Sequence, residues 1–358
     1  EPPDGYGDAC GCDSRTEPVV PKKEEKKDAC TIVETLLNQS NGGKNGINSC
    51  YRKNYNGWNC NSDQFEKSHA GACMPPRRKS LCIYILTLQE QIKDEDKLRE
   101  AFIKCAAAET CLLWHNYKKD KNDNANNLDN TLKGGNIPED FKRQMFYTFG
   151  DYRDICLGTD ISSDSNIKGI SRKVKDILNS QNGKTHEQKI TPESWWKSIE
   201  KEVWKGMLCA LSYDTEKKKM DPIVRKKLTD NNKYSKVSST LEDFASRPPF
   251  LRWFTEWGDQ FCREREKQLE SLKKKCPEKI CKGTDENKQK CTEACSAYKT
   301  FIKNWKENYE KQSEKYFQDK KDNKFESTSA NAETISSNHA YEYLNKSLKK
   351  LCPDGSCS

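Results

Sequence analysis

The sequence contains little apolar material for its length. Only 33% of its 358 residues are hydrophobic, 33% are charged, and the mean hydropathy is −1.05. No apolar run approaches the roughly 18 residues that a membrane-spanning helix needs, and the first residues, Glu1-Pro-Pro-Asp-Gly5, lack the features of a secretion signal. We therefore expect an excised extracellular module whose parent protein supplies export and anchoring, and whose thin core needs additional stabilisation.

Recognisable catalytic and metal-binding motifs are missing as well. There is no Gly-x-Ser-x-Gly elbow, phosphate-binding glycine loop or His-Glu-x-x-His pair. The four histidines, His69, His115, His186 and His339, are scattered without the spacing of metal ligands. The sequence thus predicts a protein that is not an enzyme and that needs neither a cofactor nor a metal.

Cysteine is abundant, with 18 residues, and this predicts an oxidising compartment and a disulfide framework. Each disulfide typically contributes about 2 to 4 kcal/mol of stability. We expect all cysteines to be bonded, and the sequence does not determine their pairing. They are Cys10, Cys12, Cys30, Cys50, Cys60, Cys73, Cys82, Cys105, Cys111, Cys156, Cys209, Cys262, Cys276, Cys281, Cys291, Cys295, Cys352 and Cys357.

One cysteine group could be mistaken for a zinc site. Cys276 and Cys281 are followed at short distance by Cys291 and Cys295. Structural zinc sites usually have ligands two to four residues apart, in a reducing compartment. We therefore favour disulfides here as well.

Apolar periodicity predicts a mainly α-helical chain. A short helix is expected at Thr31–Leu37 behind an Asp28 cap, within a loop-rich first part. After Pro75-Pro76, helical spacing recurs at 81–88, 98–117, 141–156 and 167–178. The polar segments 118–130 and 212–246 are expected to be a mobile surface loop and an exposed connection.

Aromatic residues follow helical spacing in the second half of the chain. A long helix is expected over 193–211 after Thr191-Pro192, and another begins at Pro248-Pro249. A cysteine-rich turn then leads into a second long helix, which makes an antiparallel hairpin, and a shorter helix is expected over 340–351. Tryptophan can bind ligands, but helical spacing favours core packing. The residues assigned to the core are Trp195, Trp196, Trp204, Trp253, Trp257 and Phe261.

Several blocks carry a family resemblance. Cys73-Met-Pro-Pro-Arg-Arg-Lys-Ser-Leu-Cys82, Phe250-Leu-Arg-Trp-Phe-Thr-Glu-Trp257 and Phe261-Cys-Arg-Glu-Arg265 resemble the Duffy-binding-like adhesion domains of malaria parasites, as found in the Plasmodium falciparum erythrocyte membrane protein 1 family. The blocks Ile137-Pro-Glu-Asp-Phe-Lys-Arg-Gln-Met145 and Tyr147-Thr-Phe-Gly-Asp-Tyr-Arg-Asp154 resemble the central helix of the family, and together with Ala340-Tyr-Glu-Tyr-Leu-Asn345 they most resemble its beta class. The resemblance covers nearly the whole chain.

The resemblance implies a disulfide-rich fold in three parts. These are a loop-rich subdomain at 1–76, a helical subdomain at 77–246 and a helical-hairpin subdomain at 247–358. Arg77 and Arg78 lie in the block that joins the first two. An arginine pair can bind carboxylate or sulfate, but we favour structural ion pairs at this junction.

The resemblance also implies a function. Such domains lie on the surface of the infected erythrocyte as parts of larger membrane-anchored, antigenically variable proteins, and adhere to host endothelium. For the beta class the leading receptor is intercellular adhesion molecule 1 (ICAM-1), which is built of immunoglobulin domains. Two alternatives remain open: a module that binds sulfated glycosaminoglycan, and a scaffold that contacts neighbouring domains. Nucleic acid is not an expected partner of an extracellular domain.

The expected receptor face is the end of the second long helix and the loop that follows it, at 309–339. Apolar anchors with charged residues around them are typical of protein interfaces. The residues assigned to this face are Tyr316, Phe317, Lys320, Lys321, Phe325 and His339. For the glycan alternative the candidate basic clusters are 22–27, 217–219, 273–275 and 320–324.

Overall fold

The computed structural model describes residues 26–38, 47, 50, 57–121, 125–182, 190–214, 217–277 and 284–352. Its elements are α1 (Ala29–Asn38), α2 (Pro76–Lys79), α3 (Tyr84–Thr87), α4 (Glu95–Asp120), α5 (Ala125–Lys133), α6 (Glu139–Leu157), α7 (Ser165–Asn182), α8 (Pro192–Ala210), β1 (Tyr213–Asp214), β2 (Lys219–Met220), α9 (Pro222–Asn231), α10 (Tyr234–Ala245), α11 (Pro249–Lys275), α12 (Asp285–Lys321), α13 (Asn331–Ile335) and α14 (Ala340–Leu351). The predicted mainly helical fold is confirmed. Within this part of the chain, no helix combines the length and the apolar character that crossing a membrane requires.

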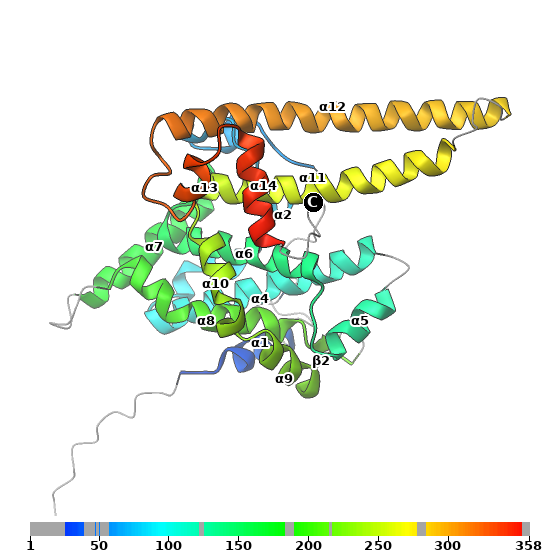
Figure 1. Cartoon of the computed structure of the whole chain (residues 1–358). Helices are drawn as coiled ribbons and strands as arrows, with labels where there is room; N and C mark the ends of the chain where they lie inside the picture. The colour runs from blue at the N-terminus through cyan, green and yellow to red at the C-terminus, as the bar shows by residue number, and fades with distance from the viewer. Residues whose placement is uncertain are drawn as a thin grey trace, which may run out of the picture.

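The body of the molecule is built around α4 and α8, which pack against each other and against α1 and α6 (Figure 1). The predicted caps are present: Asp28 accepts a hydrogen bond from the Cys30 backbone, and Thr191 begins α8 with a capping box before Pro192. Trp195, Trp196 and Trp204 are at most 1% exposed, which confirms their core role. An edge-on aromatic network of Phe102 and Phe149 surrounds them.

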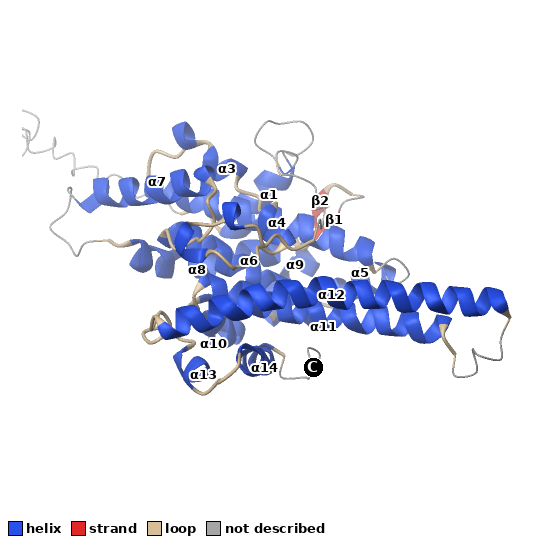
Figure 2. Cartoon of the chain, turned by 90° about the horizontal axis from the view of Figure 1, so that it is seen from above, coloured by secondary structure: helices blue, strands red, loops and turns tan. Residues whose placement is uncertain are grey.

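A second core lies beneath a long antiparallel hairpin. Helices α11 and α12 run side by side across one face of the body and project beyond it (Figures 1 and 2). Trp253 and Trp257 of α11 are buried, as expected, whereas Phe261 is only partly buried against this core. Helices α13 and α14 lie along one flank of the hairpin (Figure 2). The three proposed subdomain boundaries remain predictions.

Two polar segments are more ordered than the sequence suggested. The expected loop over 118–130 is wrong at both ends, because α4 continues to Asp120 and α5 begins at Ala125. The expected connection over 212–246 is wrong as well, because it folds into the β1–β2 hairpin and helices α9 and α10. Asp221 caps α9 through the backbone of Ile223 and Val224. A few apolar residues at helical spacing are enough to pack α9 and α10 against the body. The buried residues are Val224, Leu228, Tyr234, Val237, Leu241 and Phe244.

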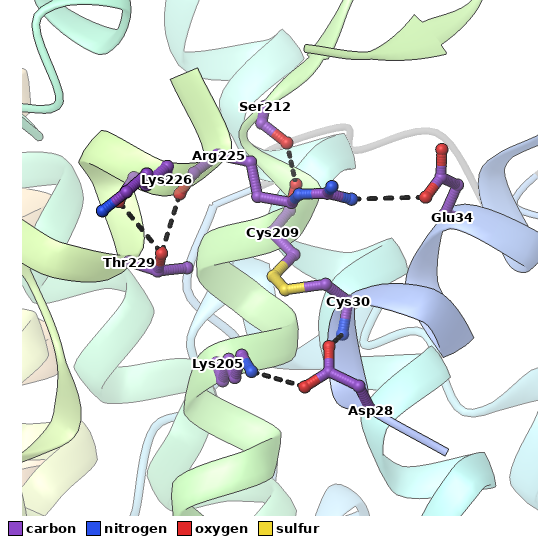
Figure 3. Close-up of a disulfide and its surroundings, with 9 residues drawn as sticks. All are labelled: Asp28, Cys30, Glu34, Lys205, Cys209, Ser212, Arg225, Lys226 and Thr229. Atoms are coloured by element: carbon purple, nitrogen blue, oxygen red, sulfur yellow. Dashed lines mark hydrogen bonds and ion pairs between the residues drawn. A yellow bond between two sulfur atoms is a disulfide. The ribbon is translucent and has the colours of Figure 1, made fainter. Parts of the chain in front are cut away.

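The Cys30–Cys209 disulfide joins α1 to the end of α8 across 179 residues (Figure 3). Charged residues flank it: Lys205 donates to Asp28, and Arg225 reaches Glu34 at 3.2 Å. Further disulfides link Cys50 to Cys82, Cys60 to Cys73 and Cys276 to Cys291, and Cys352 is also disulfide-bonded. Cys10, Cys12, Cys281 and Cys357 lie outside the described residues.

The expectation that every cysteine is bonded is wrong for five described residues. These thiols are Cys105, Cys111, Cys156, Cys262 and Cys295. Helix packing buries Cys105 and Cys156 and half-buries Cys111. Burial raises the pKa of Cys105 to about 12 and that of Cys111 to about 11, and Cys156 Sγ lies 3.9 Å from the carbonyl oxygen of Pro192.

Buried ion pairs join the body to the hairpin, and they settle the role of the arginine pair. Arg77 is 2% exposed and donates to both carboxylate oxygens of Glu256 and, at 2.6 Å, to Asp151. Arg78 is 4% exposed and donates to Asp160. Neither guanidinium is free to bind a ligand, so the structural interpretation is confirmed.

Candidate receptor-binding surface

Two large aromatic residues are exposed on α12 and α14, two helices that contact each other. Phe317 of α12 is 42% exposed, and Tyr341 in the first turn of α14 is 51% exposed. His339 stacks on Tyr341 with ring centroids 5.3 Å apart. Lys320 donates to the carbonyl oxygen of Ser337 at 2.7 Å, which holds the loop before α14 against α12.

Helix register places Phe317 on the flank of α12 that faces α14. Lys306 and Tyr309 of α12 line a groove together with Tyr341 of α14. Phe317 follows Lys306 by eleven residues, close to three helical turns, so it lies on the same flank of α12. We call the surface formed by Phe317, His339, Tyr341 and the adjoining groove the α12–α14 surface.

The groove lies between α11, α12 and α14, and has a volume of about 380 Å³. Its walls are mainly aromatic and aliphatic, with Lys306 and Asn345 as its polar members. The lining residues are Trp257, Gly258, Phe261, Cys262, Ile302, Trp305, Lys306, Tyr309, Tyr341, Leu344, Asn345 and Leu348. The volume falls within the range of about 300 to 1,000 Å³ that is typical of ligand-binding pockets.

Close approach of two helices forms one wall of this groove. A Cβ atom at Gly258 would lie 3.4 Å from methyl groups of Leu344 and Leu348, so α14 crosses α11 with little space to spare. Trp257, which is 4% exposed, lines the same region, and its indole nitrogen is buried without a hydrogen-bond partner within the described chain. The groove therefore offers mainly apolar area to a partner.

Two of the predicted apolar anchors are core residues. Tyr316 is 0% exposed and Phe325 is 4% exposed, and their rings stack at 5.8 Å. Tyr316 also packs against Tyr343 of α14. The expectation that these rings are exposed contacts is wrong, because the polar loop around Phe325 folds back and buries its one large apolar side chain.

The other predicted residues remain at the surface, and their role in receptor binding stays a prediction. Phe317, Lys321 and His339 are exposed, and Lys320 is half-buried. Nearby, Asp319 holds two lysines: Lys315 at 2.8 Å and Lys324 at 2.7 Å. Burial lowers the pKa of Lys315, although its pairing with Asp319 acts in the opposite direction.

The sequence reading missed Tyr341 and the groove. Tyr341 lies in the block Ala340-Tyr-Glu-Tyr-Leu-Asn345, where alternate residues differ strongly in burial: Tyr343 is 0% exposed and Tyr341 is 51% exposed. The helical period of α14 contained this signal, since Ala340, Tyr343 and Leu344 share the buried side. The groove could not be found this way, because it depends on how three helices cross.

The lysine clusters named for glycan binding differ where the structure describes them: Lys273, Lys274 and Lys275 are exposed and form no ion pair among the described residues, whereas other members are paired. Lys217 pairs with Asp214, and Lys324 pairs with Asp319 and Asp322. The 22–27 cluster lies mostly outside the described residues. A separate basic row on α7 was not anticipated: Lys168, Arg172 and Lys175 line a pocket of about 260 Å³.

The order of helices and the disulfides agree with a known family. The Duffy binding domain profile matches residues 71–276, which is more than half of the chain. The chain belongs to the Duffy binding domain family. Members of this family are receptor-binding adhesion modules rather than enzymes, which agrees with the expectation from the sequence.

Known Duffy binding proteins are similar over most of this chain. The Duffy receptor of Plasmodium vivax is 25% identical over 294 residues, which cover 80% of this chain and 24% of the receptor. The crystal structure of Plasmodium falciparum erythrocyte binding antigen 140 superposes with a TM-score of 0.61 at 28% identity, covering 91% of this chain and 49% of that one. This Duffy binding domain thus spans about a quarter of the length of its curated relatives.

A further solved structure is a Duffy binding domain in complex. It is a DBLbeta domain of the P. falciparum membrane protein PfEMP1 bound to ICAM-1, with a TM-score of 0.54 and 21% identity, covering 83% of this chain and 72% of that one. At this identity the similarity shows a shared fold. Homologous Duffy binding domains are extracellular or surface domains that bind host receptors, and the disulfides found here fit that setting.

Proposed function

We propose that this domain is an adhesion module that binds a host protein receptor through its α12–α14 surface. It would be displayed on the infected erythrocyte as part of a larger membrane-anchored protein. The observation that carries the proposal is an apolar groove lined by the exposed Tyr341, on a subdomain that also exposes Phe317 on α12. Large exposed aromatic residues next to a concave apolar surface are typical of protein interfaces.

The energetics favour a small number of anchors. Full burial of a large apolar side chain contributes roughly 1.5 to 3 kcal/mol. Phe317 and Tyr341 each keep about half of their surface exposed, so covering that surface would contribute about half as much. A receptor side chain that enters the groove would meet Trp305, Leu344 and Ile302 on its walls. Such anchors bring most of the binding energy in many interfaces.

Charged residues around the anchors would steer the encounter. Lys321 is exposed beside Phe317, and Lys306 lies at the groove. Exposed lysines at a rim mainly raise the association rate and the salt dependence rather than the final affinity. The surface therefore suits a receptor face with an apolar centre and acidic surroundings.

We propose ICAM-1 as the first receptor to test and the beta class as the class of this domain. The beta class rests on the resemblance of Ala340-Tyr-Glu-Tyr-Leu-Asn345 and the central helix. A DBLbeta domain of this fold has been solved in complex with ICAM-1, which supports that choice of receptor.

The test is surface-plasmon-resonance binding of the oxidised chain to the two N-terminal immunoglobulin domains of ICAM-1. Measurements at low and high salt separate the two kinds of contact, because screening weakens exposed charge pairs and leaves apolar contacts largely intact. Saturable binding with a modest salt dependence is expected. A lack of binding at micromolar concentrations rejects ICAM-1, and the same sensor run against other endothelial receptors then tests the adhesion proposal itself.

A second candidate function is binding of a sulfated glycosaminoglycan, and the basic row on α7 favours it. Lys168, Arg172 and Lys175 recur at spacings of four and three, so they share one helix face. Lys168 pairs with Glu66 at 3.1 Å, whereas Arg172 and Lys175 form no ion pair within the described chain. Two adjacent unpaired cations can bind a sulfate group.

Charge reversal of the α7 row tests this candidate. Arg172→Glu with Lys175→Glu should abolish retention on heparin, with Lys226→Glu with Lys227→Glu on α9 as the matched control. Heparin binding should also fall steeply with salt. Equal retention of both variants would reject the α7 row as a glycan site.

A further inference from the structure

Three sulfur atoms lie together at the far end of the hairpin. Cys276, Cys291 and Cys295 place their Sγ atoms within 4.8 Å of one another. Cys276 and Cys291 form a disulfide, and Cys295 is an exposed thiol. Its Sγ lies 3.9 Å from Sγ of Cys276. The group lies at the opposite end of the hairpin from α13 (Figure 1).

Helix geometry explains why both α12 cysteines reach the same partner. Cys291 and Cys295 are four residues apart, so their side chains lie one above the other on one face of α12. Cys276 is the residue that ends α11, and its Cα atom is 4.9 Å from that of Cys291. It thus faces two successive turns of α12, each of which presents a cysteine.

We propose that these residues form a thiol–disulfide exchange site, in which Cys276 bonds alternately to Cys291 and Cys295. The Cys295 thiol loses its proton to solvent, and the thiolate attacks Sγ of Cys276. The Cys276–Cys295 bond forms while the Cys276–Cys291 bond breaks, and Cys291 leaves as a thiolate that takes up a proton. One disulfide and one thiol are present before and after, so no oxidant or reductant is consumed.

Exposure and crowding support the reaction. The attacking thiol is exposed, and the bonded pair is half-buried rather than enclosed, so solvent can receive and return the proton. Exchange requires an approach of the thiolate to one sulfur of the disulfide, and at 3.9 Å the two atoms are close to van der Waals contact. A rotation of the Cys295 side chain is enough to complete that approach.

Exchange moves the crosslink along α12 by one helical turn, about 5.4 Å. The segment it encloses grows from a separation of 15 residues to one of 19, as read from positions 276, 291 and 295. The proposal also excludes a resident metal while the disulfide is intact, because a disulfide sulfur offers no thiolate ligand. It is independent of the receptor surface.

Peptide mapping of the oxidised full-length chain tests the proposal. The chain is incubated without added thiol, alkylated with N-ethylmaleimide and digested without reduction by a protease that cleaves after glutamate. Glu293 separates Cys291 from Cys295, so residues 271–278 can be found joined either to 287–293 or to 294–307. Both crosslinked peptides are expected from the wild-type chain.

Serine variants decide between the alternatives. Cys295→Ser should leave only the 271–278 to 287–293 peptide. Cys291→Ser should shift the crosslink wholly to 294–307, with an unchanged melting temperature. Cys262→Ser, which changes another thiol of the hairpin, should leave the ratio of the two peptides as in the wild type. The proposal is overturned if Cys295 is found bonded to Cys281, if the wild type shows a single linkage, or if Cys276 is alkylated in Cys291→Ser.

Discussion

The guanidinium group of Arg77 binds both carboxylate oxygens of Glu256, at 3.1 and 2.9 Å, across 179 residues of sequence. Both side chains are buried, at 2% and 9% exposure. Burial raises the pKa of Glu256, and the charge of Arg77 acts in the opposite direction to keep the carboxylate ionised. This pair fastens the block after Pro76 to the first long helix of the hairpin.

Removing one partner of this pair should be costly. Arg77→Met leaves the Glu256 charge buried and without its bidentate partner, and we expect a loss of about 3 to 5 kcal/mol in the free energy of unfolding. The double variant with Glu256→Met should recover part of that loss. Urea denaturation under non-reducing conditions measures both, with exposed Lys79→Met as the control. A single variant as stable as the control would contradict the assigned role.

The ion pair of Arg78 and Asp160 should make stability depend on acid pH. Burial would raise the pKa of Asp160, but the charge of Arg78 and hydrogen bonds from Arg78 and Ser162 outweigh it and lower the pKa below 3.8. A depressed carboxylate pKa gives stability that is present above pH 3.8 and is lost as pH falls through the folded-state value. The free energy of unfolding, measured between pH 2.5 and 6, should therefore fall more steeply with decreasing pH in the wild type than in Asp160→Asn. Parallel curves would contradict this.

The two phenylalanines of the proposed face should respond differently to truncation. Phe325 is 4% exposed, so Phe325→Ala creates a cavity and should cost about 3 kcal/mol of stability. Phe317 is 42% exposed, and Phe317→Ala should change stability by less than about 1 kcal/mol. Thermal denaturation of the two variants checks this. Equal loss in both would mean that Phe317 is a core residue.

The disulfides should contribute different amounts to the stability of the fold, depending on the length of the loop that each one closes. Cys30–Cys209 spans 179 residues and Cys60–Cys73 spans 13. In the chain-entropy view, the longer loop should give roughly 2 kcal/mol more stability. Serine pairs at each disulfide, compared by urea denaturation, test this difference. A larger loss from the 60–73 pair would show that native contacts, and not loop closure, dominate.

Helix positions could be predicted well from the sequence because the capping residues and the periodic spacing of apolar residues indicate the same boundaries. Asp28, Thr191-Pro192 and Pro248-Pro249 each precede a helix as expected, and the final helix covers 340–351. The errors fell on segments with few apolar residues. In α9 and α10, single residues such as Leu228 and Leu241 pack into the large core. These tertiary contacts stabilise helices in segments whose polar composition predicts loops.

The candidate surface was only partly predictable for a similar reason. A polar neighbourhood suggested that Phe325 is exposed, yet the loop turns it onto Tyr316. The alternation of buried Tyr343 and exposed Tyr341 follows from helix register. The groove is formed by the crossing of α14 over Gly258 of α11, and neither sequence segment encodes that crossing by itself.

The affinity of matched exposed variants tests most directly whether the α12–α14 surface binds the receptor. Phe317→Ala and Tyr341→Ala should each weaken ICAM-1 binding by at least about tenfold, or 1.4 kcal/mol, while Ile223→Ala on α9, which is 67% exposed, should bind like the wild type. Circular dichroism should show all three folded. Wild-type affinity in both aromatic variants, with binding intact, would contradict the account and move the receptor site to another face.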